Sequence, residues 1–293
     1  AYPEAKVVGN AKTFQMIENF FGLNLADKQE VVTNNGTLSL GSHTLQFFMA
    51  PMVHWPEVMV TYEQSEKILF SADAFGKFGT LDTDEDWACE ARRYYFNIVG
   101  KYGMPAQALL KKAAGLDIQK ICALHGPILT ENLEYYIGKY QLWSTYTPED
   151  EGIFIAYCSL HGNTEKAARK LAEILEAKGA PKVAISDLSR DDMAECIEDA
   201  FRYDRLVLAA PTYDGGVMPV MADFINHLKM KAYQKRKVAF IENGSWAPMA
   251  AKLMKEQMSA MKDIEIVDEH VTIRSAFKQS DVAALEALAG KLL

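Results

Sequence analysis

A short loop, SLHGNT, combines the side chains and the backbone that an anion-binding site needs. It offers the hydroxyl groups of Ser159 and Thr164, the amide of Asn163 and one glycine, Gly162. An apolar run precedes it and an amphipathic run follows it, so it should join a strand to a helix N-terminus. Helix N-termini present unpaired N–H groups and a positive dipole end, and glycine permits close approach of the backbone. The loop therefore predicts a phosphate site that uses no cationic side chain.

Two other phosphate motifs fit the sequence less well. A GxxxxGK[ST] loop would need a lysine that is not there, and a GxGxxG fingerprint would need glycines besides Gly162. Asp187 stands near the end of the next strand, where a ribose-binding acid is expected in a dinucleotide site. Without the glycines, a turn or cap role is favoured for Asp187.

Two further loops are predicted at the same edge of the sheet. PTYDGG covers residues 211–216 and ENGSWAP covers residues 242–248, and each follows an apolar strand pattern. They bring Tyr213 and Trp246, which are suited to flank a flat ring system. Ordinary packing is the alternative for each aromatic alone, but their joint position beside glycines favours a ring-binding site.

Three residues in the first half form a candidate metal-binding set. His54, Asp73 and His125 each end an apolar, strand-like run and begin a turn, in FFMAPMVHWPE, ILFSADAFG and IQKICALHGPI. Histidine and carboxylate ligands suit zinc or iron. Taken singly, each residue is more often a cap or turn residue, so the hypothesis rests on the set. His43, His227 and His270 are expected to be structural or exposed.

The second half has the pattern of a doubly wound α/β domain. Five apolar strand-like runs, beginning with GIFIAYCS and ending with IEIVDEHVTIR, alternate with five amphipathic helical runs. This alternation predicts a parallel sheet with helices on both faces, and ligands bind beyond the carboxyl ends of such strands.

The first half has a different pattern and ends in a candidate linker. Short β-rich runs occupy residues 31–73, and helical patterns follow from about Asp84 to Gly115 and from Glu131 to Trp143. The polar segment STYTPEDEG separates the halves, so we expect domains at 1–146 and 147–293.

Composition limits the class of protein. An apolar fraction of 49% and a net charge of −8, with no basic block, favour a soluble globular protein and disfavour nucleic acid or an anionic membrane as the main partner. No apolar stretch is long enough to span a bilayer, and the N-terminus does not read as a signal peptide. The four scattered cysteines favour a reducing, cytoplasmic location.

The second half resembles flavodoxin. SLHGNTEKAA is similar to the family's phosphate loop, and PTYDGG and NGSW are similar to its two ring-binding loops. The resemblance implies FMN as the cofactor. The implied contacts are Ser159, His161, Gly162, Asn163 and Thr164 at the phosphate, and Pro211, Thr212, Tyr213, Asp214, Gly215, Asn243, Gly244, Ser245 and Trp246 at the isoalloxazine ring.

The whole chain resembles the flavodiiron proteins, in which a metallo-β-lactamase-like domain precedes a flavodoxin-like domain. The order HWPE, SADAFG, HGPI, PEDEG and SLHGNT carries this resemblance. It implies two non-haem irons, with His54 on one, His125 on the other and Asp73 bridging both. It also implies reduction of dioxygen to water or of nitric oxide to nitrous oxide, a head-to-tail homodimer, and rubredoxin or a similar small carrier as electron donor.

The sequence departs from this family at one segment. Further iron ligands would come from an H-x-E-x-D segment upstream of His54, and neither H-x-E nor H-x-H occurs in these residues. Only the C-terminal part of the lactamase-like sandwich is expected here, so either a companion N-terminal segment completes it or this chain is a cut remnant. Two alternatives are an FMN electron-transfer module with an incomplete metal site and a zinc hydrolase; FMN has no evident use in the second.

Overall fold

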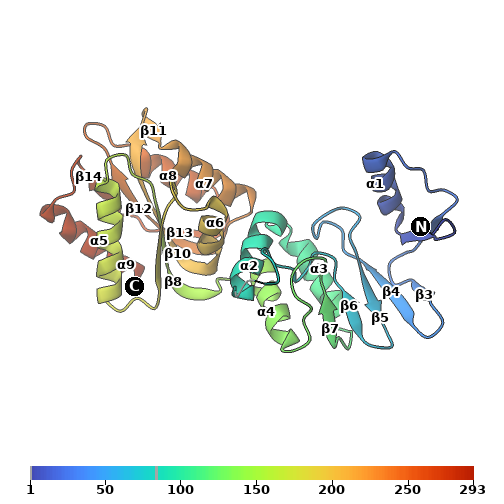
Figure 1. Ribbon diagram of the computed structural model, residues 1–293. Coiled ribbons are helices and arrows are strands. Elements are labelled where there is room, and N and C mark those ends of the chain that lie inside the picture. Colours follow the sequence, from blue (N-terminus) through green and yellow to red (C-terminus); the bar gives the residue numbers. More distant parts are fainter. Residues whose placement is uncertain (1, 83–84) are drawn as a thin grey trace. The chain divides into compact units, whose positions relative to one another are not determined.

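Two separate cores organise the chain, as seen in a computed structural model that describes residues 2–82 and 85–293 (Figure 1). One unit comprises residues 1–145 and the other residues 146–293. The junction between Thr145 and Tyr146 falls within the segment STYTPEDEG.

The second unit is built on a parallel sheet with the strand order β9-β8-β10-β12-β13. The strands of this sheet are β8 (Asp150–Tyr157), β9 (Val183–Asp187), β10 (Tyr203–Tyr213), β12 (Arg236–Asn243), β13 (Ile264–Ile266) and β14 (Val271–Ile273). The two-residue β11 (Gly216–Val217) pairs antiparallel with the end of β10. The direction of winding reverses between β8 and β10, which places the ligand-binding edge at their carboxyl ends.

Helices cover both faces of this sheet (Figure 1). α5 and α9 lie on one face, and α6, α7 and α8 lie on the other. Their bounds are α5 (Asn163–Ala177), α6 (Met193–Arg202), α7 (Pro219–Met230), α8 (Ala250–Ser259) and α9 (Val282–Leu292), with a 3-10 turn, η2 (Gln279–Asp281), before α9. Ile153, Ile155 and Tyr157 of β8 join the core under α5 and α9, as the period of two along a strand requires. The predicted doubly wound architecture is confirmed.

The last strand of this sheet is interrupted, contrary to the sequence prediction of one continuous run. β13 pairs with Arg236–Val238 of β12, and β14 pairs with Ile241–Asn243 of the same strand. Both pairings are parallel. The loop after β14 consequently opens at the same edge as the loops after β8, β10 and β12.

The first unit contains a five-stranded sheet in the order β3-β4-β5-β6-β7. Its strands are β3 (Thr37–Ser39), β4 (Thr44–Met49), β5 (Met59–Glu63), β6 (Ile68–Phe70) and β7 (Lys120–Cys122). β3 to β6 pair antiparallel, and β7 pairs parallel with β6. β4, β6 and β7 therefore run in one direction, and the loops after them emerge at one edge.

The helices of the first unit are shorter than the sequence predicted. The pattern from Asp84 to Gly115 forms a sequence of elements: α2 (Trp87–Tyr94), a π-helical turn η1 (Tyr95–Val99) and α3 (Gly103–Ala113). Gly100, with φ 38°, breaks the run; Asp84 itself lies outside the described residues. α4 (Leu133–Ser144) packs its Tyr140 and Trp143 against Tyr95 in a buried aromatic cluster.

The N-terminal elements add little to this core. β1 (Val7–Gly9) and β2 (Gln29–Val31) form a separate parallel pair, and α1 (Ala11–Phe21) between them has no buried residue. Its Phe20 ring lies 5.7 Å from that of Trp55, and both remain substantially exposed. In the part of the chain that the structure describes, no helix combines the length and apolarity needed to cross a membrane. Cys89, Cys122, Cys158 and Cys196 are free thiols.

Candidate functional site

A cavity of about 640 Å³ opens at the carboxyl edge of the parallel sheet. Of the fourteen residues expected at a cofactor, the structure places all but Gly162 in its wall. Gly162 instead ends the loop before α5 in the left-handed conformation, with φ 75°. The cavity also has four lining residues that sequence reasoning missed: Leu160, Ala247, Ser275 and Ala276.

The end of the cavity at α5 has the features of an anion site. Among the described residues, no side chain caps the N-terminus of α5, whose cap position is Gly162. The hydroxyl of Ser159 is buried, and no described residue forms a hydrogen bond with it. A buried hydroxyl without a partner is costly unless a ligand satisfies it. The orphaned Ser159 Oγ and the uncapped helix together fit a phosphate group.

The opposite end of the cavity carries the two aromatic side chains. Tyr213 is 43% exposed and Trp246 is 89% exposed, so both rings are available to a flat ligand. Thr212 Oγ1 accepts hydrogen bonds from the N–H groups of Met249 (2.9 Å) and Ala250 (3.1 Å), which joins the two ring-side loops. This end fits an aromatic ring system between two loops of fixed spacing.

A buried carboxylate, that of Glu242, forms hydrogen bonds at the start of the loop that carries Trp246. Glu242 is 4% exposed; its Oε2 accepts from Ala251 N–H at 2.9 Å and its Oε1 from the Thr272 hydroxyl at 2.8 Å. A hydrogen-bonded carboxylate near the start of α8 also suits the helix dipole. Close packing then restricts the next turn, because a Cβ on Gly244 would lie 2.8 Å from Pro248 Cα.

The three candidate metal ligands of the first unit meet at one place. His54 follows β4, Asp73 follows β6 and His125 follows β7, the three strands that run in one direction. His54 Nε2 lies 3.4 Å from Asp73 Oδ2, and His125 Nε2 lies 3.9 Å from Asp73 Oδ1. Each imidazole therefore faces a different oxygen of the same carboxylate.

With one imidazole near each of its oxygens, Asp73 is placed where a carboxylate could be shared between two ions. Among the described residues, no group of three or more His, Cys, Asp or Glu side chains is arranged to hold one ion. Asp73 could bridge two ions, with His54 on one side and His125 on the other. Two ions held in this way would each need further ligands.

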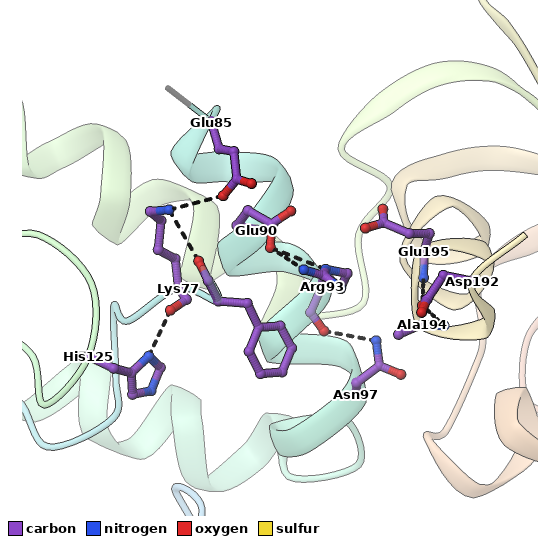
Figure 2. A network of polar contacts seen from close by, with 10 residues as sticks. Lys77, Glu85, Glu90, Arg93, Asn97, His125, Asp192, Ala194 and Glu195 are labelled. Atoms are coloured by element: carbon purple, nitrogen blue, oxygen red, sulfur yellow. Dashed lines mark hydrogen bonds and ion pairs between the residues drawn. The ribbon is translucent and has the colours of Figure 1, made fainter. Parts of the chain in front are cut away.

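A backbone carbonyl fixes the orientation of His125 (Figure 2). His125 Nδ1 lies 2.9 Å from the carbonyl oxygen of Lys77. Because a carbonyl oxygen only accepts, Nδ1 carries a proton, and Nε2 is the ring nitrogen that faces Asp73. Such outer hydrogen bonds set the tautomer of metal-binding histidines.

A tyrosine that sequence reasoning missed lies beside both histidines. The Tyr94 ring centroid is 4.5 Å from that of His125 and 6.4 Å from that of His54. Its hydroxyl is buried, and no described residue forms a hydrogen bond with it. Burial, with a smaller contribution from the negative charge of Asp73, raises the pKa of Tyr94 well above its ordinary value. Tyr94 is thus a neutral phenol, and nothing in EARRYY marks it in the sequence.

The three histidines expected to be structural or exposed, and Asp187, each have a partner in the protein; His270 Nε2, for example, lies 3.4 Å from Glu242 Oε1. His43 pairs with Glu63 at 3.2 Å, and His227 pairs with Asp223 at 3.6 Å. Asp187 Oδ1 accepts from Ser189 N–H at 2.9 Å, which closes a turn.

Comparisons with known proteins match both halves of the chain. Residues 1–126 match the family model described as ODP family beta lactamase, and residues 154–285 match the model described as flavodoxin domain. A structure solved as the flavodiiron protein from Giardia intestinalis superposes with a TM-score of 0.88 at 20% identity, over 97% of this chain and 72% of that chain. The chain therefore combines a lactamase-like domain with a flavodoxin domain.

Relatives of this chain include a protein named as a reductase. A nitric oxide reductase of Moorella thermoacetica is 28% identical over 91% of this chain and 68% of the relative. An uncharacterized protein of Methanocaldococcus jannaschii is 29% identical, over 85% of this chain and 64% of its own length. The chain thus spans about two thirds of the length of these relatives.

Solved structures support the fold. Rubredoxin oxygen:oxidoreductase from Desulfovibrio gigas superposes with a TM-score of 0.88 at 24% identity, over 98% of this chain and 73% of that chain. At this identity the likeness shows the fold of the chain and no more.

Gly76, in the turn after Asp73, leaves room for the His125 ring. A Cβ at position 76 would lie 2.7 Å from His125 Nδ1. We expect Gly76→Ala to displace the ring, to weaken the bond to Lys77 O, and to lower the unfolding free energy by about 1–3 kcal/mol. The measurement is ¹⁵N NMR of the imidazole, which reports which nitrogen of His125 is protonated, together with thermal unfolding.

Gly138→Ala is the matched control for this substitution. Gly138 lies in α4, and a Cβ there would meet nothing within 4 Å. Alanine should raise stability by up to about 1 kcal/mol at a helix position of this kind. A Gly76→Ala variant with the His125 tautomer and stability of the parent would show that the tight approach has no positioning role.

Proposed function

We propose that this chain is a flavodiiron oxidoreductase that reduces dioxygen to water, nitric oxide to nitrous oxide, or both, at a non-haem diiron site supplied with electrons through FMN. The observation that carries the proposal is the pair of imidazoles on separate oxygens of Asp73, at 3.4 and 3.9 Å. The same chain carries a cavity suited to a phosphorylated flat ring. The matched relatives include a nitric oxide reductase and a rubredoxin-oxygen oxidoreductase.

His54, Asp73 and His125 are the residues proposed to hold the irons. Imidazole and carboxylate ligands suit iron, and a bridging carboxylate keeps two ions close enough to act on both atoms of one small substrate. Lys77 O keeps His125 Nε2 available to its ion. The Tyr94 ring packs against His125 and reduces the freedom of that side chain. The remaining iron ligands are proposed to come from a companion N-terminal segment outside these residues.

FMN is the cofactor proposed for the cavity in the second unit. Ser159, Asn163 and Thr164, with the N-terminus of α5, would bind its phosphate, and Tyr213 and Trp246 would flank its ring. Bound FMN supplies electrons singly or in pairs, which suits a reduction that needs several electrons.

The second candidate function is an FMN electron-transfer module whose metal site is incomplete. It is favoured by the small number of metal-ligating side chains around Asp73 in the described part of the chain. Such a module would bind FMN and exchange electrons with a carrier, but it would not hold iron.

Three further expectations concern partners and location. Rubredoxin or a similar small carrier is proposed as the electron donor, supported by the relative named rubredoxin-oxygen oxidoreductase. A head-to-tail homodimer is proposed from the family resemblance, and a cytoplasmic location is proposed from the four scattered cysteines. Gel filtration with and without FMN tests the dimer.

Iron and zinc content per FMN is the measurement that tests the function. Purified protein carrying this chain should hold about two irons per flavin, as a two-metal site requires, and should consume dioxygen or nitric oxide when a reductant is supplied. Flavin without metal would instead support the electron-transfer module. Zinc without flavin would contradict both candidates.

A further inference from the structure

One loop at the cofactor cavity has no counterpart among the three loops recognised in the sequence. Residues 274–277, with the sequence RSAF and here named the 274–277 loop, follow β14. Because β14 runs parallel to β12, this loop emerges at the ligand-binding edge. Ser275 and Ala276 line the cavity.

The 274–277 loop forms hydrogen bonds with residues 242–248, the loop that carries Trp246 and is here named the ring-side loop. Ser275 Oγ donates to Ser245 Oγ at 2.7 Å, and Asn243 Nδ2 donates to the Ser275 carbonyl at 3.0 Å. The N–H of Gly244 donates to the carbonyl of Ile273 at 3.1 Å. Three hydrogen bonds thus connect residues 273–275 to residues 243–245.

At Phe277, the 274–277 loop also forms a hydrogen bond with residues 159–164, the predicted phosphate loop SLHGNT. The N–H of Phe277 donates to Asn163 Oδ1 at 3.3 Å, and the Phe277 side chain packs against the core under α5. Lys278 closes the loop, because its Nζ donates to the carbonyl of Arg274 at 3.0 Å. The four residues therefore join the two ends of the cavity.

Ser275 adopts a backbone conformation that favours glycine. Its φ is 63°, in the left-handed region where a Cβ is disfavoured. Glycine at this position would relieve the backbone but would lose the hydroxyl that contacts Ser245. The strained serine at the cavity wall is consistent with a use for that hydroxyl.

We propose that the 274–277 loop is a fourth cofactor-binding loop, which fixes the spacing between the phosphate end and the ring end and lies along the ribityl chain between them. This inference rests on the proposed FMN function. Ser275 is a positioning residue: it acts on the flavin ring through Ser245 and the ring-side loop.

The test compares FMN affinity with the stability of the cofactor-free chain. We expect Ser275→Ala and Ser275→Gly to weaken FMN binding about fivefold, the loss of roughly one hydrogen bond. Thermal unfolding of the cofactor-free Ser275→Gly variant should occur at or above the temperature of the parent, because glycine relieves the backbone. In both Ser275 variants the visible absorption spectrum of bound FMN should also shift. The ring-side loop loses its hydrogen bond to the Ser275 hydroxyl, so the surroundings of the flavin ring change.

Ser245→Ala and Ser280→Ala complete the experiment. Ser245→Ala should weaken FMN as Ser275→Ala does, and the double variant should be no weaker than either single one, because both remove the same contact. Ser280 lies outside the cavity and is exposed, so Ser280→Ala should bind like the parent.

Three results would count against the inference. Affinity within twofold of Ser280→Ala in both Ser275 variants would overturn it, and additive effects in the double variant would overturn the contact with Ser245. If Ser275→Gly lost FMN affinity and its cofactor-free form also unfolded at a lower temperature than the parent, the substitution would have destabilised the protein in general. A parent chain that fails to bind FMN would overturn the proposed cofactor itself, a result distinct from the other three.

Discussion

Replacing Asp73 with alanine should abolish iron binding and the reduction of dioxygen or nitric oxide, while FMN binding and flavin reduction stay at the level of the parent. Asp73 has one carboxylate oxygen toward His54 and the other toward His125. Without it, each ion loses a charged ligand and the link to its neighbour. The FMN cavity lies in the other unit and has no lining residue from this loop.

Two further variants sharpen this experiment. Asp73→Asn keeps the shape of the side chain but offers only one carbonyl oxygen, so it should also fail to bridge and should lose most of the iron. Asp117→Ala is the control: Asp117 is a largely exposed acid of the same unit that pairs with Lys67. Metal analysis and oxygen uptake are the measurements. Turnover that survives in Asp73→Ala would place the reduction at the flavin and would refute the diiron assignment.

Much of the candidate site could be predicted from sequence because the loops that follow strands running in one direction emerge at the same edge of a sheet. His54, Asp73 and His125 each end an apolar run, and β4, β6 and β7 run in one direction, so their following loops converge. The loops after β8, β10 and β12 converge for the same reason. A local pattern sufficed in these cases because the position of a loop follows from the direction of its strand.

The contacts that orient the candidate metal ligands could not be predicted from the sequence in this way. The Lys77 carbonyl reaches His125 from a residue far away in the sequence, and any residue type could provide it. Tyr94 lies on α2 and faces the histidines only because of how that helix packs. Backbone donors and packed faces depend on tertiary structure, which a residue type does not reveal.

The 274–277 loop was missed for a different reason, the continuity of an apolar pattern. In IEIVDEHVTIR the apolar residues alternate on both sides of the break, and Val267 within it is buried like a strand residue. The periodicity therefore predicted one strand, although β13 and β14 pair with separate parts of β12. Recognising two strands would have placed Ser275 at the ligand-binding edge.

Ser159→Ala should have opposite effects on the cofactor-free protein and on its complex. The buried hydroxyl has no hydrogen-bond partner among the described residues, so removing it should leave the unfolding temperature of the cofactor-free chain unchanged or higher. A hydrogen bond to a charged group contributes about 1.5–3 kcal/mol, so FMN affinity should fall roughly 10- to 100-fold. Flavin fluorescence titration and thermal unfolding measure the two quantities.

Riboflavin separates the phosphate assignment from a general loss of the cavity. It lacks the phosphate, so its affinity should be the same in the parent and in Ser159→Ala. Thr164→Val, which removes a second hydroxyl from a buried position at the start of α5, should have the same signature. If both variants kept the FMN affinity of the parent, the anion would not bind at this helix, and the orphaned hydroxyl of Ser159 would need another explanation. A fall in FMN affinity without one for riboflavin ties the phosphate to the start of α5, because only the phosphate distinguishes the two ligands.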